Sequence, residues 1–356
     1  MIIFDSHLDL GWNAVNYNRD LTKSIAEIRK SEAGSKEKGR GTNTVSFPEM
    51  RKGEVALCLA TVFARATSLG EPMADYRSQE IAYAVAQAHR AYYRVMESEG
   101  QVRMVKDWPS LEGHLGDWKG PQNGSAPLGF ILSMEGADPI VSPSRVAEWW
   151  GDGLRVVGPG HYGLNAYAHG TASPGGLTSK GRELVKAMDA VHMILDVTHL
   201  ADQAFWEAVE LFHGPILASH HNCRALVPGD RQLTDEQVRH LIQRDSVIGT
   251  AFDAWMLFPG WEKGKTSNQV VSLEDAVNHI DHVCQLAGNA NHAAIGSDLD
   301  GGFGTEQCPR DLDTIAELQK IAGILRKRGY KEADVESVMH GNFIRFFRKA
   351  WSNLPP

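Results

Sequence analysis

The sequence of 356 residues has few cysteines, namely Cys58, Cys223, Cys284 and Cys308. They lie far apart and show no paired spacing, which argues against a zinc ribbon and against a CxxC redox motif. Cys223 lies near a candidate metal ligand, but a lone cysteine is usually a small, readily buried side chain. We therefore assign no chemical role to these thiols.

Three other features are missing: a long basic run, an apolar run long enough to span a bilayer, and a secretory signal. The net charge is −8, and no basic run could neutralise a row of phosphates or coat an anionic membrane. The first residues, Met-Ile-Ile-Phe-Asp-Ser-His, lack the basic and apolar regions of a signal peptide. We therefore expect a cytoplasmic protein that binds neither nucleic acid nor membranes.

What the sequence does have is a repeated alternation of short apolar runs and amphipathic helical stretches. Runs rich in Val, Ile and Leu are typical of parallel strands that are buried on both faces. We predict eight such strands, at 2–5, 55–63, 129–134, 154–157, 193–197, 215–218, 247–252 and 293–296. We predict helices at about 75–98, 144–151, 179–191, 201–212, 234–244, 273–287, 311–328 and 332–348. The alternation predicts a (β/α)8 TIM barrel.

One large domain over residues 1–356 is compatible with this length, because TIM barrels often carry long loop insertions. Hydrophobic residues make up 42% and charged residues 22%, as expected of a globular chain with a sizeable core. Two stretches, at about 18–47 and 116–128, read as loops because they are rich in charge, glycine or proline.

Residues able to bind a metal follow the predicted strands. In a TIM barrel the catalytic groups lie at the carboxyl ends of the strands, so the residue after each apolar run is informative. The candidates at these positions are His7, Asp9, Glu135, His199, His220 and Asp298. His7 and Asp9 are two residues apart, so in an extended segment their side chains can meet one cation.

Each candidate alone has an ordinary structural explanation. Glu135 could be a helix cap or an ion-pair partner, and single histidines after strands are often hydrogen-bonded core residues. His221 is an alternative to His220, but the next side chain of an extended segment turns the opposite way. The recurrence of such residues at the strand ends of one predicted barrel favours a shared metal site.

Three histidines and several carboxylates without cysteine suit zinc, manganese, iron or cobalt. Six ligand-capable groups exceed the three protein ligands of a usual catalytic zinc. A pair of ions bridged by a carboxylate accounts for the surplus, and such centres hold a hydroxide at neutral pH.

These residues stand in segments that resemble the membrane (renal) dipeptidase family of zinc metallopeptidases. The resemblance runs nearly from end to end. Its segments are Asp5-Ser-His-Leu-Asp, Thr42-Asn-Thr-Val-Ser-Phe-Pro-Glu-Met-Arg-Lys-Gly, Met134-Glu-Gly-Ala, Gly176-Leu-Thr-Ser-Lys-Gly-Arg-Glu, Leu195-Asp-Val-Thr-His, Ser219-His, Asp230-Arg-Gln-Leu-Thr-Asp, Ile295-Gly-Ser-Asp-Leu-Asp-Gly and Gly341-Asn-Phe-Ile-Arg.

The resemblance implies a metal-dependent hydrolase barrel that cleaves the amide bond of dipeptides with two Zn²⁺ per chain and a metal-bridging hydroxide. It implies that one zinc is bound by His7 and Asp9, that the other is bound by His199 and His220, and that both share Glu135. It further implies a substrate contact at His161, a carboxylate clamp at Arg231 and an acid/base carboxylate at Asp298. A homodimer is also implied by the resemblance.

Two segments depart from the family pattern. After His161 the sequence reads Tyr-Gly-Leu-Asn-Ala-Tyr-Ala-His-Gly, where the best-known members have a Cys-Asn-Thr-Pro-Trp-Ala-Asp-like continuation. Phe252-Asp-Ala stands where those members have a tyrosine near the substrate. We therefore expect a substrate pocket that differs from theirs around His161 and Asp253.

Two other functions fit the same residues. One is a related amidohydrolase for N-acyl amino acids, cyclic amides or lactones, and the other is an altered barrel that tailors peptide metabolites. Many amidohydrolases bridge their metals with a carboxylated lysine after the fourth strand, but residues 154–161 contain no lysine. The complete ligand set argues against a barrel without catalysis.

Overall fold

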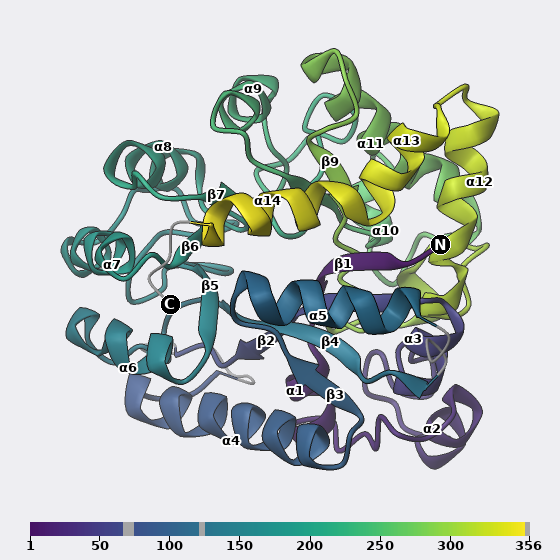
Figure 1. Cartoon of the computed structure of the whole chain (residues 1–356), viewed down its shortest axis with the longest axis horizontal. Helices are drawn as coiled ribbons and strands as arrows, with labels where there is room; N and C mark the ends of the chain where they lie inside the picture. Colours follow the sequence, from purple (N-terminus) through teal and green to yellow (C-terminus); the bar gives the residue numbers. More distant parts are fainter. Residues whose placement is uncertain (67–74, 121–124, 353–356) are drawn as a thin grey trace.

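The computed structural model describes residues 1–66, 75–120 and 125–352 (Figure 1). Its sheet is parallel, and its neighbouring strands follow the order β7-β6-β5-β4-β2-β1-β9-β8. These strands are β1 Ile3–Leu8, β2 Val55–Phe63, β4 Leu128–Glu135, β5 Leu154–Gly158, β6 Ile194–Asp196, β7 Ile216–Leu217, β8 Ile248–Thr250 and β9 Ala293–Ile295. A short extra strand, β3 (Val102–Met104), pairs with the start of β4.

The two ends of this sheet meet, so the strands close into a barrel. Ala218 forms a parallel bridge with Ile248. Its amide donates a hydrogen bond to the Val247 carbonyl at 3.0 Å, and its carbonyl accepts one from Gly249 at 2.8 Å. The predicted TIM barrel is therefore confirmed, and each predicted strand overlaps an observed one.

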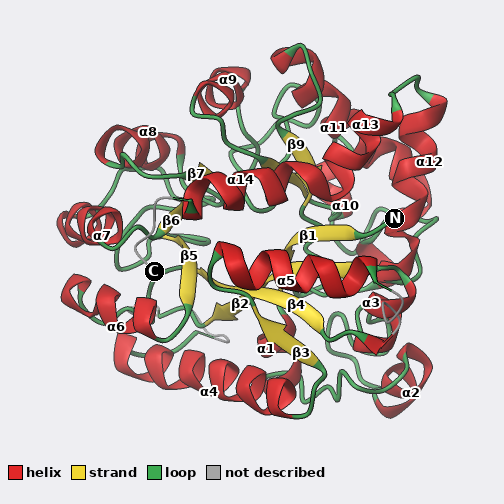
Figure 2. Cartoon of the chain, in the orientation of Figure 1, coloured by secondary structure: helices red, strands yellow, loops and turns green. Residues whose placement is uncertain are grey.

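Helices surround the strands (Figure 2). They are α1 Leu10–Val15, α2 Ile25–Ser31, α3 Phe47–Lys52, α4 Gln79–Ser98, α5 Trp108–Lys119, α6 Val146–Gly151, α7 Ser179–Ala190, α8 Asp202–Leu211, α9 Asp235–Gln243, α10 Ala254–Leu257, α11 Leu273–Ala287, α12 Lys320–Lys327, α13 Glu332–Glu336 and α14 Asn342–Trp351. Short 3₁₀ segments lie at Pro143–Arg145, Asn268–Val270, Thr305–Gln307 and Ile315–Gln319, and a π-helical turn at Ser337–Gly341.

The predicted loop at 116–128 is wrong at its start, because α5 continues to Lys119. The helix contains Gly113 and Gly116, which weaken helix propensity, and Pro109, but a proline near a helix start loses no hydrogen bond. The Asp107 side chain accepts a hydrogen bond from the Ser110 amide at 2.9 Å and caps the helix. Residues 121–124 of the predicted loop lie outside the described residues.

The predicted loop at 18–47 contains a helix, α2. Ser24 and Glu27 form a capping box at its start, and Ile25 and Ile28 are buried. The helix predicted at 311–328 begins only at Ile315, because Thr314 caps a 3₁₀ turn that leads into α12. At the start of α2 the local capping signal of Ser24 and Glu27 was present in the sequence, but the surrounding charge and glycine favoured a loop.

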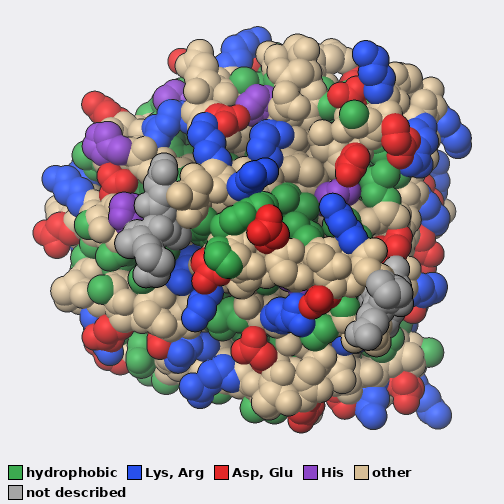
Figure 3. All heavy atoms as spheres, in the orientation of Figure 1, with side chains coloured by type: hydrophobic (Ala, Val, Ile, Leu, Met, Phe, Trp, Pro, Cys, Tyr) green, Lys and Arg blue, Asp and Glu red, His purple; other side chains and the backbone are tan. Residues whose placement is uncertain are grey.

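The amino end of the barrel is closed by α14, which crosses the strands together with α5 (Figure 1). Phe4 of β1 stacks on Phe343 and Phe347, with ring centroids 5.1 and 5.7 Å apart. Leu57 and Leu59 of β2 belong to the same apolar cluster. Cys58 and Ala60, which alternate with them, belong to the outer cluster beneath the helices. On the face seen in Figure 3, basic and acidic side chains are interspersed.

The barrel interior leaves no room for side chains beside the Ser219 carbonyl. A Cβ on Gly296 would lie 1.9 Å from the Ser219 oxygen and 2.7 Å from Ser6 Oγ. The backbone of three strands therefore approaches closely just below His220, and only glycine fits there.

Gly296→Ala should therefore lower the free energy of unfolding by about 1–3 kcal/mol or more through overpacking, measured by urea denaturation. Gly323→Ala is the matched control. Gly323 lies in α12 with no atom within 4 Å of its Cβ position, so alanine should raise stability by roughly 0.5–1 kcal/mol. A Gly296→Ala protein as stable as wild type would show that the interior can expand.

Candidate metal centre

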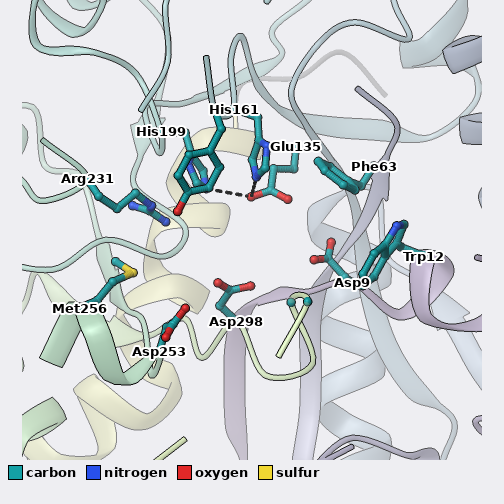
Figure 4. Close-up of a pocket in the computed structure, with 13 residues that line it drawn as sticks. Asp9, Trp12, Phe63, Glu135, His161, His199, Arg231, Asp253, Met256 and Asp298 are labelled. Atoms are coloured by element: carbon teal, nitrogen blue, oxygen red, sulfur yellow. Dashed lines mark ion pairs between the residues drawn. The ribbon is translucent and has the colours of Figure 1, made fainter. Parts of the chain in front are cut away.

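The predicted site residues come together at the carboxyl end of the barrel. Figure 4 shows those that line the pocket, namely Asp9, Glu135, His161, His199, Arg231 and Asp298. His7 lies in β1 and Asp9 follows it, while Glu135 is the last residue of β4. Further residues of the site lie in the loops after β5, β6, β7 and β9; they are His161, His199, His220, Arg231 and Asp298. Because parallel strands all point the same way, these side chains reach one pocket from many parts of the chain.

His7, Asp9 and Glu135 form one group whose donor atoms lie within 4.8 Å of one another. His7 Nε2 lies 3.8 Å from Asp9 Oδ2 and 3.7 Å from Glu135 Oε1. This nitrogen is buried and has no hydrogen-bond partner among the described residues. The hydroxyl of Thr61 donates a hydrogen bond to Asp9 and orients its carboxylate.

Glu135, His199 and His220 form a second group. The Nε2 atoms of both histidines lie 3.2 Å from Glu135 Oε1 and 3.2 Å from each other. The other ring nitrogens are held from behind, since Thr171 Oγ1 lies 3.1 Å from His199 Nδ1 and Ser219 Oγ lies 2.9 Å from His220 Nδ1. Such partners orient the ring of a metal-binding histidine.

Charge in this cluster is poorly balanced. Burial raises the pKa of Glu135 well above its usual range and that of Asp298 to about 8. Burial opposes charge on His7, but Glu135, Asp9 and Asp298 raise the pKa of its imidazolium to about 10. Burial lowers the pKa of His199 and His220 well below the usual range, so these rings are neutral. For the carboxyl groups of both Glu135 and Asp298 to be ionised at neutral pH, further positive charge must be bound beside them.

The donors present fit divalent metal ions. They are imidazole nitrogens and carboxylate oxygens without cysteine, and His7 Nε2 has no other partner. Glu135 belongs to both groups, which is the arrangement that a bridging carboxylate requires. His7, His220 and Asp298 form a third group, with Asp298 Oδ1 3.7 Å from His7 Nε2. Asp298 has a positive φ of 59°, a strained conformation for a residue other than glycine.

Arg231 and His161 line the same pocket. Arg231 Nη2 donates a hydrogen bond to the His220 carbonyl at 2.9 Å, and its buried Nη1 has no partner among the described residues. His161 Nε2 lies 3.8 Å from Glu135 Oε1. The pocket thus contains a fixed guanidinium with one nitrogen that lacks a partner among the described residues, an imidazole whose pKa burial holds well below its usual range, and the candidate metal ligands.

His221 and Cys223 belong to none of the three groups. His221 is buried, and its amide donates to the Gly249 carbonyl. Burial raises the pKa of the Cys223 thiol to about 12, and the sulfur contacts the His279 carbonyl. The expectation of buried cysteines holds for all four.

The apolar and aromatic part of the pocket wall was not predicted from the sequence. Trp12, Phe63, Tyr162 and Met256 line a pocket of about 210 Å³. This is smaller than the roughly 300–1,000 Å³ typical of drug-sized ligands, so the pocket suits a small molecule. Phe63 and Tyr162 could have been found, because each stands at or just after the end of a barrel strand.

The chain matches the family model described as membrane dipeptidase (peptidase family M19) over residues 1–353. A protein of Klebsiella pneumoniae, described as uncharacterised and lying in the pqqA 5′ region, is 30% identical over 234 residues, which are 63% of this chain and 83% of that protein. Dipeptidase tcpJ of Claviceps purpurea is 29% identical over 201 residues, which are 55% of this chain but only 45% of that protein.

Two solved structures share the fold. A metallopeptidase from Rhodobacter sphaeroides, liganded with a phosphinate mimic of the dipeptide L-Ala-D-Ala, superposes with a TM-score of 0.80 at 23% identity, covering 99% of both chains. The probable dipeptidase PvdM from Pseudomonas aeruginosa superposes with a TM-score of 0.79 at 18% identity, covering 99% of this chain and 96% of that one.

Among the described residues, no helix has both the length and the apolar character needed to cross a bilayer. The family match covers almost the whole sequence and confirms the expected family and its class of enzyme. The chain belongs to the membrane dipeptidase family, peptidase family M19, a family of metallo-dipeptidases with this barrel fold.

Proposed function

We propose that this protein hydrolyses the amide bond of dipeptides at a binuclear metal centre, with zinc as the ion that best suits its donors. The observation that carries the proposal is the position of Glu135, whose carboxylate is shared by the group with His7 and Asp9 and by the group with His199 and His220. A cytoplasmic location, a single domain over residues 1–356 and a homodimer stay predictions.

In this proposal His7 and Asp9 hold one ion, His199 and His220 hold the other, and Glu135 bridges them. When bound, two such ions polarise the scissile carbonyl and make water nucleophilic at neutral pH. The protein supplies the geometry, because Thr61, Thr171 and Ser219 orient ligand side chains from behind.

Asp298 is the proposed general acid and base. Its carboxylate lies at the centre and lines the pocket, so it can take a proton from the attacking water and give it to the leaving amine. Burial raises the pKa of Asp298 to about 8 in the metal-free protein, so its carboxyl group can hold a proton near neutral pH. His161, a neutral ring on the pocket wall, can donate a hydrogen bond to the oxyanion of the tetrahedral intermediate.

Arg231 is the proposed clamp for the carboxylate of the substrate. Its side chain is 1% exposed, and one guanidinium nitrogen is fixed by the His220 carbonyl while the other has no partner among the described residues. A guanidinium fork can bind a carboxylate through two parallel hydrogen bonds. The hydrogen bond from Arg231 to the His220 carbonyl also links the position of the substrate carboxylate to the proposed metal ligand His220.

His199→Ala should bind one metal equivalent fewer than the wild type, which should hold about two per chain. The group of Glu135, His199 and His220 loses one of its three donors in this variant. The fold should persist, because it is stabilised by the packing of the barrel. Elemental analysis of the purified protein measures the metals, and circular dichroism verifies the fold.

Asp298→Asn is the matched control for this variant, because an amide keeps the shape but cannot accept and return a proton. It should keep both metals and lose about 10²–10⁴-fold in rate. Full turnover of His199→Ala would refute the ligand assignment. Loss of metal from Asp298→Asn would make Asp298 a ligand.

Amidation of the C-terminal carboxylate should make a dipeptide a poorer substrate, because Arg231 then loses its charged partner. A charge-assisted hydrogen bond is worth about 1.5–3 kcal/mol, so kcat/KM should fall about ten- to a hundred-fold. The comparison uses free and amidated dipeptides with wild type, Arg231→Ala and Arg231→Lys. Lysine keeps the charge but lacks the fork, so it should restore little.

If the wild type discriminates against the amidated dipeptide and Arg231→Ala does not, the clamp is at Arg231. If the wild type cleaves both substrates equally well, no clamp exists, and the related amidohydrolase for N-acyl amino acids, cyclic amides or lactones becomes the better assignment.

A further inference from the structure

Asp253 is a buried carboxylate on the pocket wall that the proposed chemistry does not use. It is 7% exposed and lies directly before α10. Its two oxygens each accept a hydrogen bond from an uncharged donor, at 2.7 Å from Trp255 Nε1 and 2.6 Å from Gln307 Nε2. Among the described residues, it forms no ion pair with a lysine, arginine or histidine side chain. A charge buried in this way is costly unless a cation comes to it.

The carboxylate is held in place and charged at neutral pH. Trp255 and Gln307 bind it from different segments and fix its orientation. The Asp253 side chain therefore loses little conformational entropy when a ligand binds. Burial raises the pKa of Asp253 to about 6, which leaves it ionised above pH 7. Lys38 is close enough to lower this pKa, but its amine lies over the Phe303 ring, 5.8 Å from the centroid.

Asp253 lies on the same side of the pocket as the proposed carboxylate clamp. In Figure 4, Met256 and Asp253 line the wall below Arg231, whereas Trp12 and Phe63 line the opposite wall. A dipeptide whose carboxylate bound Arg231 would have its C-terminal residue on this side of the pocket, beside the wall that Met256 and Asp253 form.

We propose that Asp253 determines specificity by binding a positively charged side chain on the C-terminal residue of the dipeptide, such as the ammonium of lysine or ornithine. The inference rests on the proposed dipeptidase function. The methylene groups of such a side chain pack against the flexible, apolar Met256 side chain. Its ammonium donates to the carboxylate oxygens of Asp253, which retain free lone pairs beside the bonds from Trp255 and Gln307.

The first experiment compares kcat/KM for alanyl-lysine and alanyl-norleucine, which have equally long side chains but differ in charge. We expect the metal-loaded wild type to prefer alanyl-lysine by about ten- to a hundred-fold. Asp253→Asn should remove this preference, so that kcat/KM becomes equal for the two dipeptides. Glu306→Gln is the matched control. Like Asp253, Glu306 raises the pKa of Lys38 through its negative charge, but it is exposed and does not line the pocket. It should keep the preference.

The second experiment measures binding without turnover, so that it stays informative if dipeptides are not the substrates. Calorimetry with L-lysine and L-norleucine should show tighter binding of lysine to wild type and equal binding of both to Asp253→Asn. Equal binding or equal hydrolysis of the two side chains by wild type overturns the inference. An equal fall in kcat/KM for both dipeptides in Asp253→Asn also overturns it. That result would mean that Asp253 binds the amino group of the substrate or stabilises the fold.

Discussion

Glu135 lies where four imidazoles converge, and the burial of its carboxylate governs the whole site. Two of the Nε2 atoms, of His199 and His220, lie 3.2 Å from the same oxygen. Asp9 and Asp298 add negative charge to this region and raise the pKa of Glu135 further. A carboxylate is tolerated at such a depth only when compensating positive charge is bound there. The residues around Glu135 therefore have the character of a cation-binding site.

The fold meets this constraint by placing its tightest apolar packing at the amino end and the middle of the barrel, away from the polar site at the carboxyl end. At the amino end, α14 closes the barrel with a phenylalanine stack on Phe4. Near the middle, the strands approach so closely at Gly249 and Gly296 that neither could carry a Cβ. The carboxyl end is left to polar side chains. There His199 and Asp298 have positive φ angles, a strained conformation that the packed barrel can maintain.

Much of the fold, and the residues that converge at the candidate metal centre, could be predicted from strand ends, because barrel periodicity determines which side chains come together. His161 and Arg231 came only from family resemblance, since they stand beyond the strands in loops. Helix α5 was missed because glycine weakens helix propensity, while its buried Leu111 and Leu115 stabilise it through tertiary packing. The setting of Asp253 depends on Gln307, 54 residues away, and such a contact has no local signal in the sequence.

The claim on which the account depends is that Glu135 bridges two metal ions. Anomalous diffraction from crystals of the protein as purified tests it most directly, because the method locates each metal separately. The account predicts two peaks, one beside His7 and Asp9 and one beside His199 and His220, each within coordination distance of Glu135. A single peak, or a second peak away from Glu135, would contradict it.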